Sequence, residues 1–388
     1  MSRANPYLVS RLQGYTGTIF SEMSALAVAT GSINLGQGFP DSDGPDLIKR
    51  AAMRAIEAGH NQYPPGIGIV ELREAISAHQ SRFRALDFDP ATEVLVTAGA
   101  TEAIAASLLA LCEVGDEVIM FEPYYDAYAA CTAMAGARRS VVPLRSPDWS
   151  FDPATLEAAV SDRTRLVLVN TPHNPTGKVF SRAELEVIAE LCRRHDLLAV
   201  TDEVYEHLVY DAPHVSLASL PGMADRTVTI SSAAKTFSFT GWKIGWACAQ
   251  PDLLAAVRAA KQFLTYVNGG PFQYAIAEGL ERCDEYVVEA AATLREKRDL
   301  LADGLAGAGF EVFASPGTFF LTTDISTLTD EDSYNFCRAL PERCGVVAIP
   351  SSDFYDDPDA GRHLVRWMFS KRREVLEEAV ARLARLRV

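Results

Sequence analysis

The order of short β-branched runs and longer helical patterns constrains the fold of this chain most. Between about residues 45 and 280 the two kinds of segment alternate along the chain. This order is typical of a mostly parallel sheet that is covered by helices on both faces. The sequence therefore predicts a large α/β domain over residues 45–280. The strand candidates are four or five residues long and rich in apolar side chains, and they are 93–97, 117–121, 165–169, 198–201, 227–230 and 244–247.

The pattern changes after about residue 280. A long amphipathic helix is expected through Arg295 and Lys297, and another helix closes the chain. This order favours a smaller α+β domain over residues 281–388. Residues 1–44 show little periodicity, so we expect them to pack on the small domain or on a partner subunit. The strand candidates of the small domain lie near 310–313, 319–323, 346–349 and 364–369.

The chain is acidic, with 36 Lys and Arg against 51 Asp and Glu and a formal net charge of −15. This balance disfavours binding to nucleic acid or anionic membranes, because no basic patch offsets it. The first ten residues lack the charged and apolar segments of a secretory signal, and no apolar run is as long as a membrane span. We therefore expect a cytoplasmic protein without nucleic-acid or membrane partners.

The cysteines and histidines show no spacing that is typical of a metal site. The seven cysteines include no C-x-x-C pair, and the seven histidines form no H-E-x-x-H motif. We expect reduced thiols and no bound metal.

Lys235 lies just beyond the strand candidate 227–230, among small and hydroxylated residues. A lysine in such a water-poor position has its neutral amine favoured, and an imine-forming nucleophile requires a neutral amine. The alternative is an ordinary surface lysine, since burial is inferred here from the neighbouring residues.

Two segments offer hydrogen-bond donors to an anion. Ser232 and Lys243 flank Lys235, and a turn between them would bring a hydroxyl and a cation to one phosphate. Gly99-Ala100-Thr101 stands where a strand ends and a helical pattern begins, so free backbone N–H groups and the helix dipole favour an anion there. This second segment alone is equally compatible with a plain structural turn.

Polar side chains also follow two other strand candidates. Asn174 lies in a loop that two X-Pro steps and Gly177 make rigid, directly after the strand 165–169. Asp202 ends the strand 198–201, where a carboxylate is costly unless it is paired. Asp202 could instead cap a helix, and Tyr205 could simply pack.

Arg366 is the only charged residue of the strand candidate 364–369. Its guanidinium lies on an apolar strand, which indicates a buried anion-binding group. A structural buried ion pair is the competing interpretation.

Taken together, these residues resemble the class I/II aminotransferases, which are fold-type-I enzymes that use pyridoxal 5'-phosphate (PLP). The similarity runs through nearly the whole chain, from 34–40 and 61–64 to 365–369. Within this family the chain is most similar to the kynurenine, glutamine and methionine aminotransferases and to bacterial N-succinyldiaminopimelate aminotransferases. The resemblance implies the family's α/β fold, with a mostly parallel seven-stranded sheet in the large domain and a smaller α+β C-terminal domain.

The resemblance also implies roles for the cofactor. Lys235 would bind PLP covalently and later move a proton between the substrate Cα and the cofactor. Asp202 would keep the pyridine nitrogen protonated, so that the ring acts as an electron sink. Tyr205 and Asn174 would donate hydrogen bonds to the ring's phenolate oxygen, and Tyr125 would stack on the ring. The phosphate would be held by Gly99, Ala100, Thr101, Ser232 and Lys243, and by Tyr63 of a second subunit, which implies a homodimer.

The same resemblance places the substrate. Arg366, with Asn174 beside it and the backbone N–H of Gly36, would bind the α-carboxylate. Phe20, Tyr63, Tyr125 and Tyr266 are expected to face the substrate side chain, and no second arginine can be placed for a distal carboxylate. This set favours donors of the kynurenine, glutamine, methionine or aromatic type, with a 2-oxo acid acceptor.

Two alternatives stay open at this point. The first is N-succinyldiaminopimelate, a donor of lysine biosynthesis, whose long arm could lie across the small residues near Asn268 and Gly269. The second is β-elimination from cysteine S-conjugates, since that reaction could use the same Lys235 and Asp202.

Overall fold

The structure is a computed structural model that describes residues 5–386. Its centre is a seven-stranded sheet in the order β2-β8-β7-β6-β5-β3-β4, in which only β8 runs antiparallel to its neighbours. The predicted α/β class with a mostly parallel sheet is therefore confirmed. The strands are β2 (Val94–Thr97), β3 (Glu117–Glu122), β4 (Arg138–Pro143), β5 (Thr164–Asn170), β6 (Leu198–Asp202), β7 (Thr227–Ser232) and β8 (Gly245–Cys248).

Strand β4 was not among the strand candidates. It begins with Arg138 and Arg139, which are exposed, and it pairs only with β3 at one edge of the sheet. An edge strand keeps one side in water, so its sequence lacks the continuous apolar run by which the buried strands were found.

Helices cover both faces of the sheet, because neighbouring residues of its inner strands point to opposite sides and both sides are apolar. Val118 and Met120 pack in one core, whereas Ile119 and Phe121 pack in the other. Burial of each such side chain stabilises the fold by about 1.5–3 kcal/mol. The surrounding helices are α4 (Ala100–Leu111), α5 (Asp126–Met134), α6 (Pro153–Ala158), α7 (Arg182–Arg194) and α9 (Pro251–Lys261).

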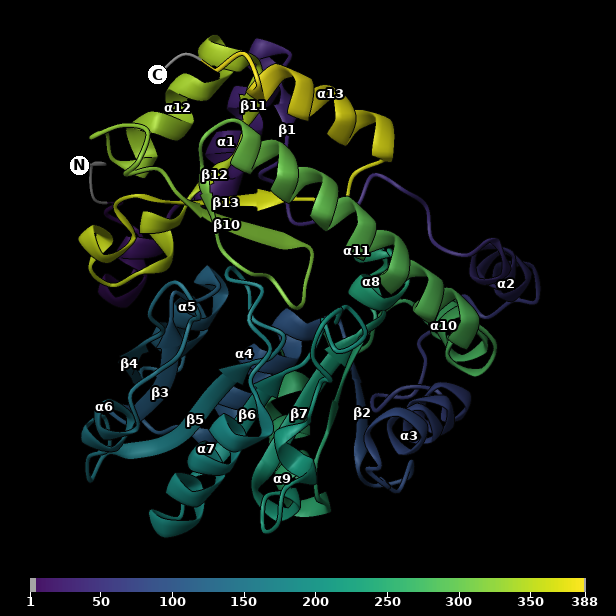
Figure 1. Ribbon diagram of the computed structural model, residues 1–388. Coiled ribbons are helices and arrows are strands. Elements are labelled where there is room, and N and C mark those ends of the chain that lie inside the picture. Colours follow the sequence, from purple (N-terminus) through teal and green to yellow (C-terminus); the bar gives the residue numbers. More distant parts are fainter. Residues whose placement is uncertain (1–4, 387–388) are drawn as a thin grey trace.

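A second group of elements lies against the large sheet, drawn in green and yellow in Figure 1. Its four-stranded antiparallel sheet has the order β12-β13-β10-β9. The strands are β9 (Glu311–Val312), β10 (Phe320–Asp324), β11 (Val346–Val347), β12 (Ile349–Pro350) and β13 (Leu364–Met368), and the helices are α11 (Asp284–Gly307), α12 (Ser333–Cys344) and α13 (Arg373–Leu383).

The N-terminal part of the chain joins this second group. Strand β1 (Ile33–Asn34) pairs in parallel with β11, and helix α1 (Ile19–Thr30) packs on α12. Of the predicted N-terminal segment, residues 1–4 lie outside the described part of the chain. The domain boundaries after residues 44 and 280 stay a prediction.

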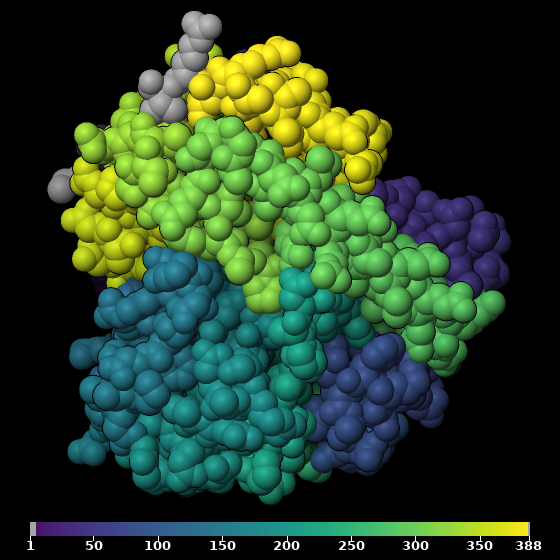
Figure 2. All heavy atoms as spheres, viewed as in Figure 1, coloured from purple at the N-terminus to yellow at the C-terminus, as the bar shows by residue number. Residues whose placement is uncertain are grey.

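In Figure 2 the green and yellow-green atoms of this second group lie directly against the blue and teal atoms of the large domain.

The remaining helices connect these parts. Helices α2 (Asp46–Glu57) and α3 (Val70–Arg84) both pack on α10 (Gly270–Arg282), which leads into α11. The short helix α8 (Ala233–Thr236) follows β7 directly. Among residues 5–386, no helix combines the length and the apolar composition that crossing a membrane requires.

Candidate active site

A cavity of about 340 Å³ lies where the carboxyl ends of β5, β6 and β7 meet the N-terminus of α4 and the strands β10 and β13. Ligands of α/β sheets bind at such strand ends, where loops and helix N-termini converge. The cavity wall brings together most of the predicted site residues. They are Phe20, Gly99, Ala100, Thr101, Tyr125, Asn174, Asp202, Tyr205, Ser232, Lys235, Lys243 and Arg366.

Lys235 stands on α8, so the short turn after β7 places its side chain in the cavity wall. Its Nζ donates a hydrogen bond of 2.8 Å to the carbonyl of Gly38 and lies 5.7 Å from the ring centre of Tyr205. Loss of water around the ammonium lowers the pKa of Lys235 to about 8. With this pKa roughly a tenth of the amine is neutral at pH 7, far more than for an ordinary lysine, and a nucleophile requires the neutral form.

Asp202 ends β6 and is buried. Its Oδ2 accepts a hydrogen bond of 2.7 Å from the Tyr128 hydroxyl, and its Oδ1 accepts one of 3.3 Å from the N–H of Val204. Burial raises the pKa of Asp202 to about 6, while these two donors oppose the rise. The carboxylate is thus mostly ionised at pH 7 and can face a positive group in the cavity.

Tyr128 was not predicted as a site residue, although it is fully enclosed and lines the cavity. It lies on α5, one helical turn after Tyr125, so both tyrosines face the same way. Their rings meet edge to face at 5.7 Å. The three-residue spacing was visible in the sequence, but the contact with Asp202 depends on how α5 packs on the sheet.

Asn174 and Tyr205 complete the wall beside Asp202. The backbone N–H of Asn174 donates to the side chain of Asn170 at 2.7 Å, which fixes the loop after β5. Tyr205 is buried and meets the ring of Phe319 edge to face at 5.2 Å. Both side chains therefore have fixed positions.

The N-terminus of α4 forms a cradle with Lys243. Gly99 has φ +77°, which favours glycine, and a Cβ built there would lie 3.2 Å from the Lys243 Nζ. Ser232 and the first residues of α4 line the same end of the cavity. A cation, a hydroxyl and free N–H groups at a helix N-terminus are the donors that a phosphate requires.

Asn268 supports this cradle, which the sequence did not indicate. Its Nδ2 donates to the carbonyl of Lys243 at 2.7 Å and to that of Thr97 at 3.3 Å. The region near Asn268 was expected to leave room for a long substrate arm. In this chain Asn268 instead connects the end of β2 to Lys243 and does not line the cavity.

Arg366 projects from β13 into the cavity and is buried. Its Nη1 donates to the Asn174 Oδ1 at 2.9 Å, and its Nη2 donates to the carbonyl of Gly36 at 2.8 Å. The guanidinium lies 4.0 Å from the ring centre of Phe320 and 4.9 Å from that of Phe20. Burial lowers the pKa of Arg366 to about 10, so it stays cationic at neutral pH.

Gly36 contacts Arg366 through a different backbone atom from the one that the sequence predicts. Its N–H was expected to bind a carboxylate, but it donates to the Asn34 Oδ1 at 2.8 Å. Gly36 therefore contacts Arg366 through its carbonyl oxygen. The signal for this arrangement is the Asn two residues earlier, since Asn side chains often accept from the backbone two residues on.

Tyr63 lies outside the cavity of this chain. Its side chain is 82% exposed, and its ring meets that of Tyr266 edge to face at 5.7 Å. Neither tyrosine lines the cavity, whereas Phe20 and Tyr125 do. Of the four residues predicted to face the substrate side chain, two therefore line the cavity of this chain and two do not.

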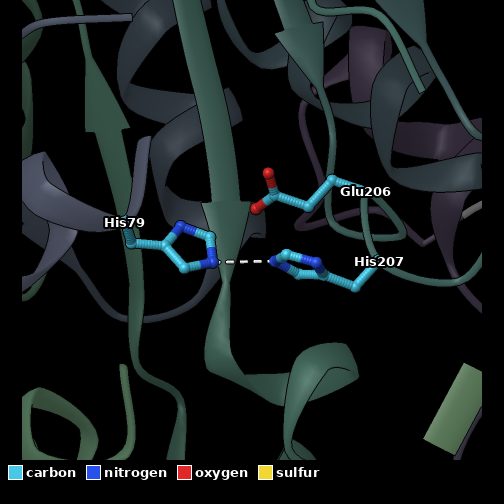
Figure 3. A group of neighbouring side chains, drawn as sticks. All are labelled: His79, Glu206 and His207. Atoms are coloured by element: carbon cyan, nitrogen blue, oxygen red, sulfur yellow. Dashed lines mark hydrogen bonds between the residues drawn. The ribbon is translucent and has the colours of Figure 1, made fainter. Parts of the chain in front are cut away.

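His79, Glu206 and His207 form a buried cluster (Figure 3), and Glu206 and His207 directly follow Tyr205 in the chain. The Glu206 carboxylate accepts from the Arg84 Nε at 2.8 Å and from the Ser231 hydroxyl at 2.6 Å. The Nε2 atoms of His79 and His207 lie 2.7 Å apart in a hydrogen bond in which one imidazole donates to the other. The Glu206 oxygens and both Nε2 atoms thus already have partners, which identifies a hydrogen-bonded core rather than a vacant ligand set.

The buried histidines predict an acid-sensitive fold. Burial lowers the pKa of His207 to about 3, below its unfolded value, so the unfolded chain binds more protons below about pH 6.5. The stability due to neutral His207 is present above that pH and is lost as the pH falls towards 3. Urea titrations from pH 7.5 to 4.5 should therefore show a shallower pH dependence for His207→Gln, by up to about 1.4 kcal/mol per pH unit. The same change at surface His195 serves as the control, and equal slopes for wild type and His207→Gln would contradict the prediction.

Comparisons with known proteins agree with this geometry. Residues 30–383 match the family model "Aminotransferase class I and II". The chain is 54% identical to a probable N-succinyldiaminopimelate aminotransferase of Mycobacterium tuberculosis, over 97% of this chain and 98% of that protein. The solved structure of the N-succinyldiaminopimelate aminotransferase from that organism superposes with a TM-score of 0.95, over 97% of this chain and 99% of the other.

Two further relatives are named for other amino-acid substrates. The methionine aminotransferase of Escherichia coli is 38% identical over 97% of this chain and 98% of its own length. A mouse kynurenine–oxoglutarate transaminase is 37% identical over 95% of this chain and 88% of its own length. The family match and these relatives show that the chain is an aminotransferase and belongs to the class I and II family.

Proposed function

We propose that this enzyme uses PLP to move the amino group of an L-amino acid of the kynurenine, glutamine, methionine or aromatic type to a 2-oxo acid. One observation carries the proposal. A single cavity contains a lysine with a lowered pKa, a buried carboxylate, an anion cradle and one arginine.

The residues of the cavity fit PLP by their chemistry. The cradle of Gly99, Ser232 and Lys243 suits a phosphate, and Asp202 suits a protonated pyridine nitrogen. Tyr205 and the Nδ2 of Asn174 can donate to a phenolate oxygen, since the Asn174 Oδ1 is occupied by Arg366. When bound, PLP supplies an electron sink for the negative charge that develops at the substrate Cα.

The chain's own residues then divide the work. The Lys235 amine accepts the proton from the substrate Cα and passes it to the cofactor. Its lowered pKa suits both steps near neutral pH. Asp202 holds its negative charge against the ring nitrogen, and the Tyr128 hydroxyl fixes that carboxylate in place.

Arg366 orients the substrate. Each of its two terminal nitrogens carries two N–H groups and uses one of them for Asn174 or Gly36, so both nitrogens can still donate to the two oxygens of a carboxylate. The aromatic rings around the guanidinium exclude water and strengthen this ion pair. The other cavity-lining cations, Lys235 and Lys243, are assigned to the cofactor, so among the described residues 5–386 the cavity wall offers no further cation to a distal carboxylate.

A second candidate donor is N-succinyldiaminopimelate. The 54% identity to a mycobacterial protein named for this substrate favours it, and that similarity extends over almost the full length of both chains. The substrate arm would have to reach past the cavity of one subunit, towards residues of a partner.

Competition kinetics distinguish the two candidates. We expect kcat/KM for at least one of methionine, glutamine, kynurenine or phenylalanine to equal or exceed that for N-succinyldiaminopimelate, with a panel of 2-oxo acids as acceptors. A value for N-succinyldiaminopimelate more than about tenfold above all four would establish the second candidate instead. Release of pyruvate and ammonia from a cysteine S-conjugate, faster than amino transfer, would identify a β-lyase.

We further propose a homodimer in which Tyr63 reaches the cofactor phosphate of the partner subunit. Its 82% exposure and its ring contact with the exposed Tyr266, which follows the exposed Phe263 by three residues, support an interface there. Mixing a Tyr63→Ala with an Arg366→Ala variant should restore about a quarter of wild-type activity, because half of the dimers are mixed and each mixed dimer has one intact site. A fully active monomer in sedimentation, or no recovery on mixing, would contradict the shared site.

A further inference from the structure

Two residues of the cavity wall have no role in holding the cofactor or in moving the proton. Ser24 of α1 and Gln37 of the loop after β1 both line the cavity, next to Phe20 and Phe39. These two are uncharged polar side chains, and they belong to the N-terminal segment rather than to the segments that follow β5 to β7. They therefore lie where a substrate side chain would meet the protein.

The position of Gln37 follows from its two neighbours. The carbonyl of Gly36 accepts from the Arg366 Nη2 at 2.8 Å, and the carbonyl of Gly38 accepts from the Lys235 Nζ at 2.8 Å. Gln37 thus stands between the group that binds the α-carboxylate and the group that takes the Cα proton. A substrate held by both groups has its side chain within reach of Gln37.

The loop that carries Gln37 has a fixed shape. The Asn34 Oδ1 accepts from the N–H of Gly36 at 2.8 Å and from the N–H of Gln37 at 3.2 Å. The Gln37 Nε2 donates across the cavity wall to the Ser24 Oγ at 3.4 Å. Both side chains are half-buried, so their orientation is set before a substrate arrives.

This pairing leaves two complementary groups for a ligand. The Gln37 Oε1 accepts no hydrogen bond from another residue within the described range 5–386, and the Ser24 hydroxyl still has its proton to donate. An acceptor and a donor side by side match the N–H and the C=O of an amide.

We infer that Ser24 and Gln37 form the subsite for the substrate side chain and that this subsite recognises an uncharged amide. The inference rests on the proposed function and narrows its substrate class. Both a terminal carboxamide and an internal N-acyl amide belong to this class, so glutamine and N-succinyldiaminopimelate each present the required group. A carboxylate at the same place has no N–H, so it could not donate a hydrogen bond to the Gln37 Oε1.

Three donors of similar length and shape test the inference: L-glutamine, L-glutamate and L-methionine. The wild type should prefer glutamine to glutamate by about 100-fold or more in kcat/KM, because a buried carboxylate without a cation is strongly disfavoured. Two neutral hydrogen bonds are lost in the Ser24→Ala/Gln37→Leu double variant, so its glutamine-to-methionine ratio of kcat/KM should fall about 30-fold. Each single variant should lower that ratio about fivefold.

The glutamine-to-methionine ratio of kcat/KM distinguishes a loss of amide recognition from damage to the fold. Structural damage lowers kcat/KM for both donors together and leaves their ratio unchanged. Ser21→Ala is the matched control, because Ser21 is exposed one turn earlier on the same helix and lies outside the cavity wall. An unchanged ratio in the double variant, or a wild-type preference for glutamate, would overturn the inference. Absence of amino transfer from every donor in the wild type would instead overturn the proposed function.

Discussion

Replacing Lys235 with Ala is expected to lower the rate of amino transfer by at least about 10⁴-fold, because one side chain both binds the cofactor covalently and moves the proton. The Lys235 amine is poised for both tasks, since burial lowers its pKa to about 8. The fold should be unaffected, because the Nζ makes one hydrogen bond to the carbonyl of Gly38. Loss of the borohydride-reducible cofactor adduct in Lys235→Ala, measured by mass spectrometry, checks the covalent role separately from activity.

Lys243 provides the control for this experiment. It lines the same cavity but lies at the phosphate cradle beside Gly99. Lys243→Ala should weaken cofactor binding while a reducible adduct still forms on Lys235. An adduct that persists in Lys235→Ala and disappears in Lys243→Ala would reverse the two assignments.

Replacing Asp202 with Ala or Asn is expected to lower kcat by roughly 100–1000-fold, the size of the loss when one preorganised electrostatic group is removed. Asn keeps the shape and removes the charge, so a similar loss in both variants would assign the effect to the charge. The buried carboxylate has a pKa of about 6, which predicts that activity falls as the pH drops through this value. Near-normal turnover of Asp202→Asn would show that another group holds the ring nitrogen.

Tyr128→Phe extends the test of Asp202 to its positioning residue. The Tyr128 hydroxyl stabilises the ionised carboxylate, so its loss raises the pKa of Asp202. The acid limb of the pH–rate profile should then move to higher pH, with a loss of about fivefold in kcat at pH 7. A uniform loss at every pH would indicate a packing defect at α5 instead.

The sequence by itself determined the fold class and the chemical character of the site. β-branched runs separated by helical patterns predict a mostly parallel sheet wherever both faces of a strand are buried. The residues at the ends of those runs, including Asn174, Asp202 and Lys235, do meet in one cavity. Carboxyl ends of parallel strands lie at the same edge of a sheet, so their convergence follows from chain direction alone.

The tertiary structure decided which atoms satisfy which partners. Tyr128 reaches Asp202 from 74 residues away, and Arg84 reaches Glu206 from 122 residues away. No local sequence pattern predicts either contact, because each depends on how a helix packs on the sheet. The N–H of Gly36 is occupied by Asn34. The exposed edge strand β4 escaped prediction for the related reason that a half-solvated strand lacks an apolar run. Periodicity reports burial of a surface, whereas hydrogen-bond partners are chosen only when distant segments come into contact.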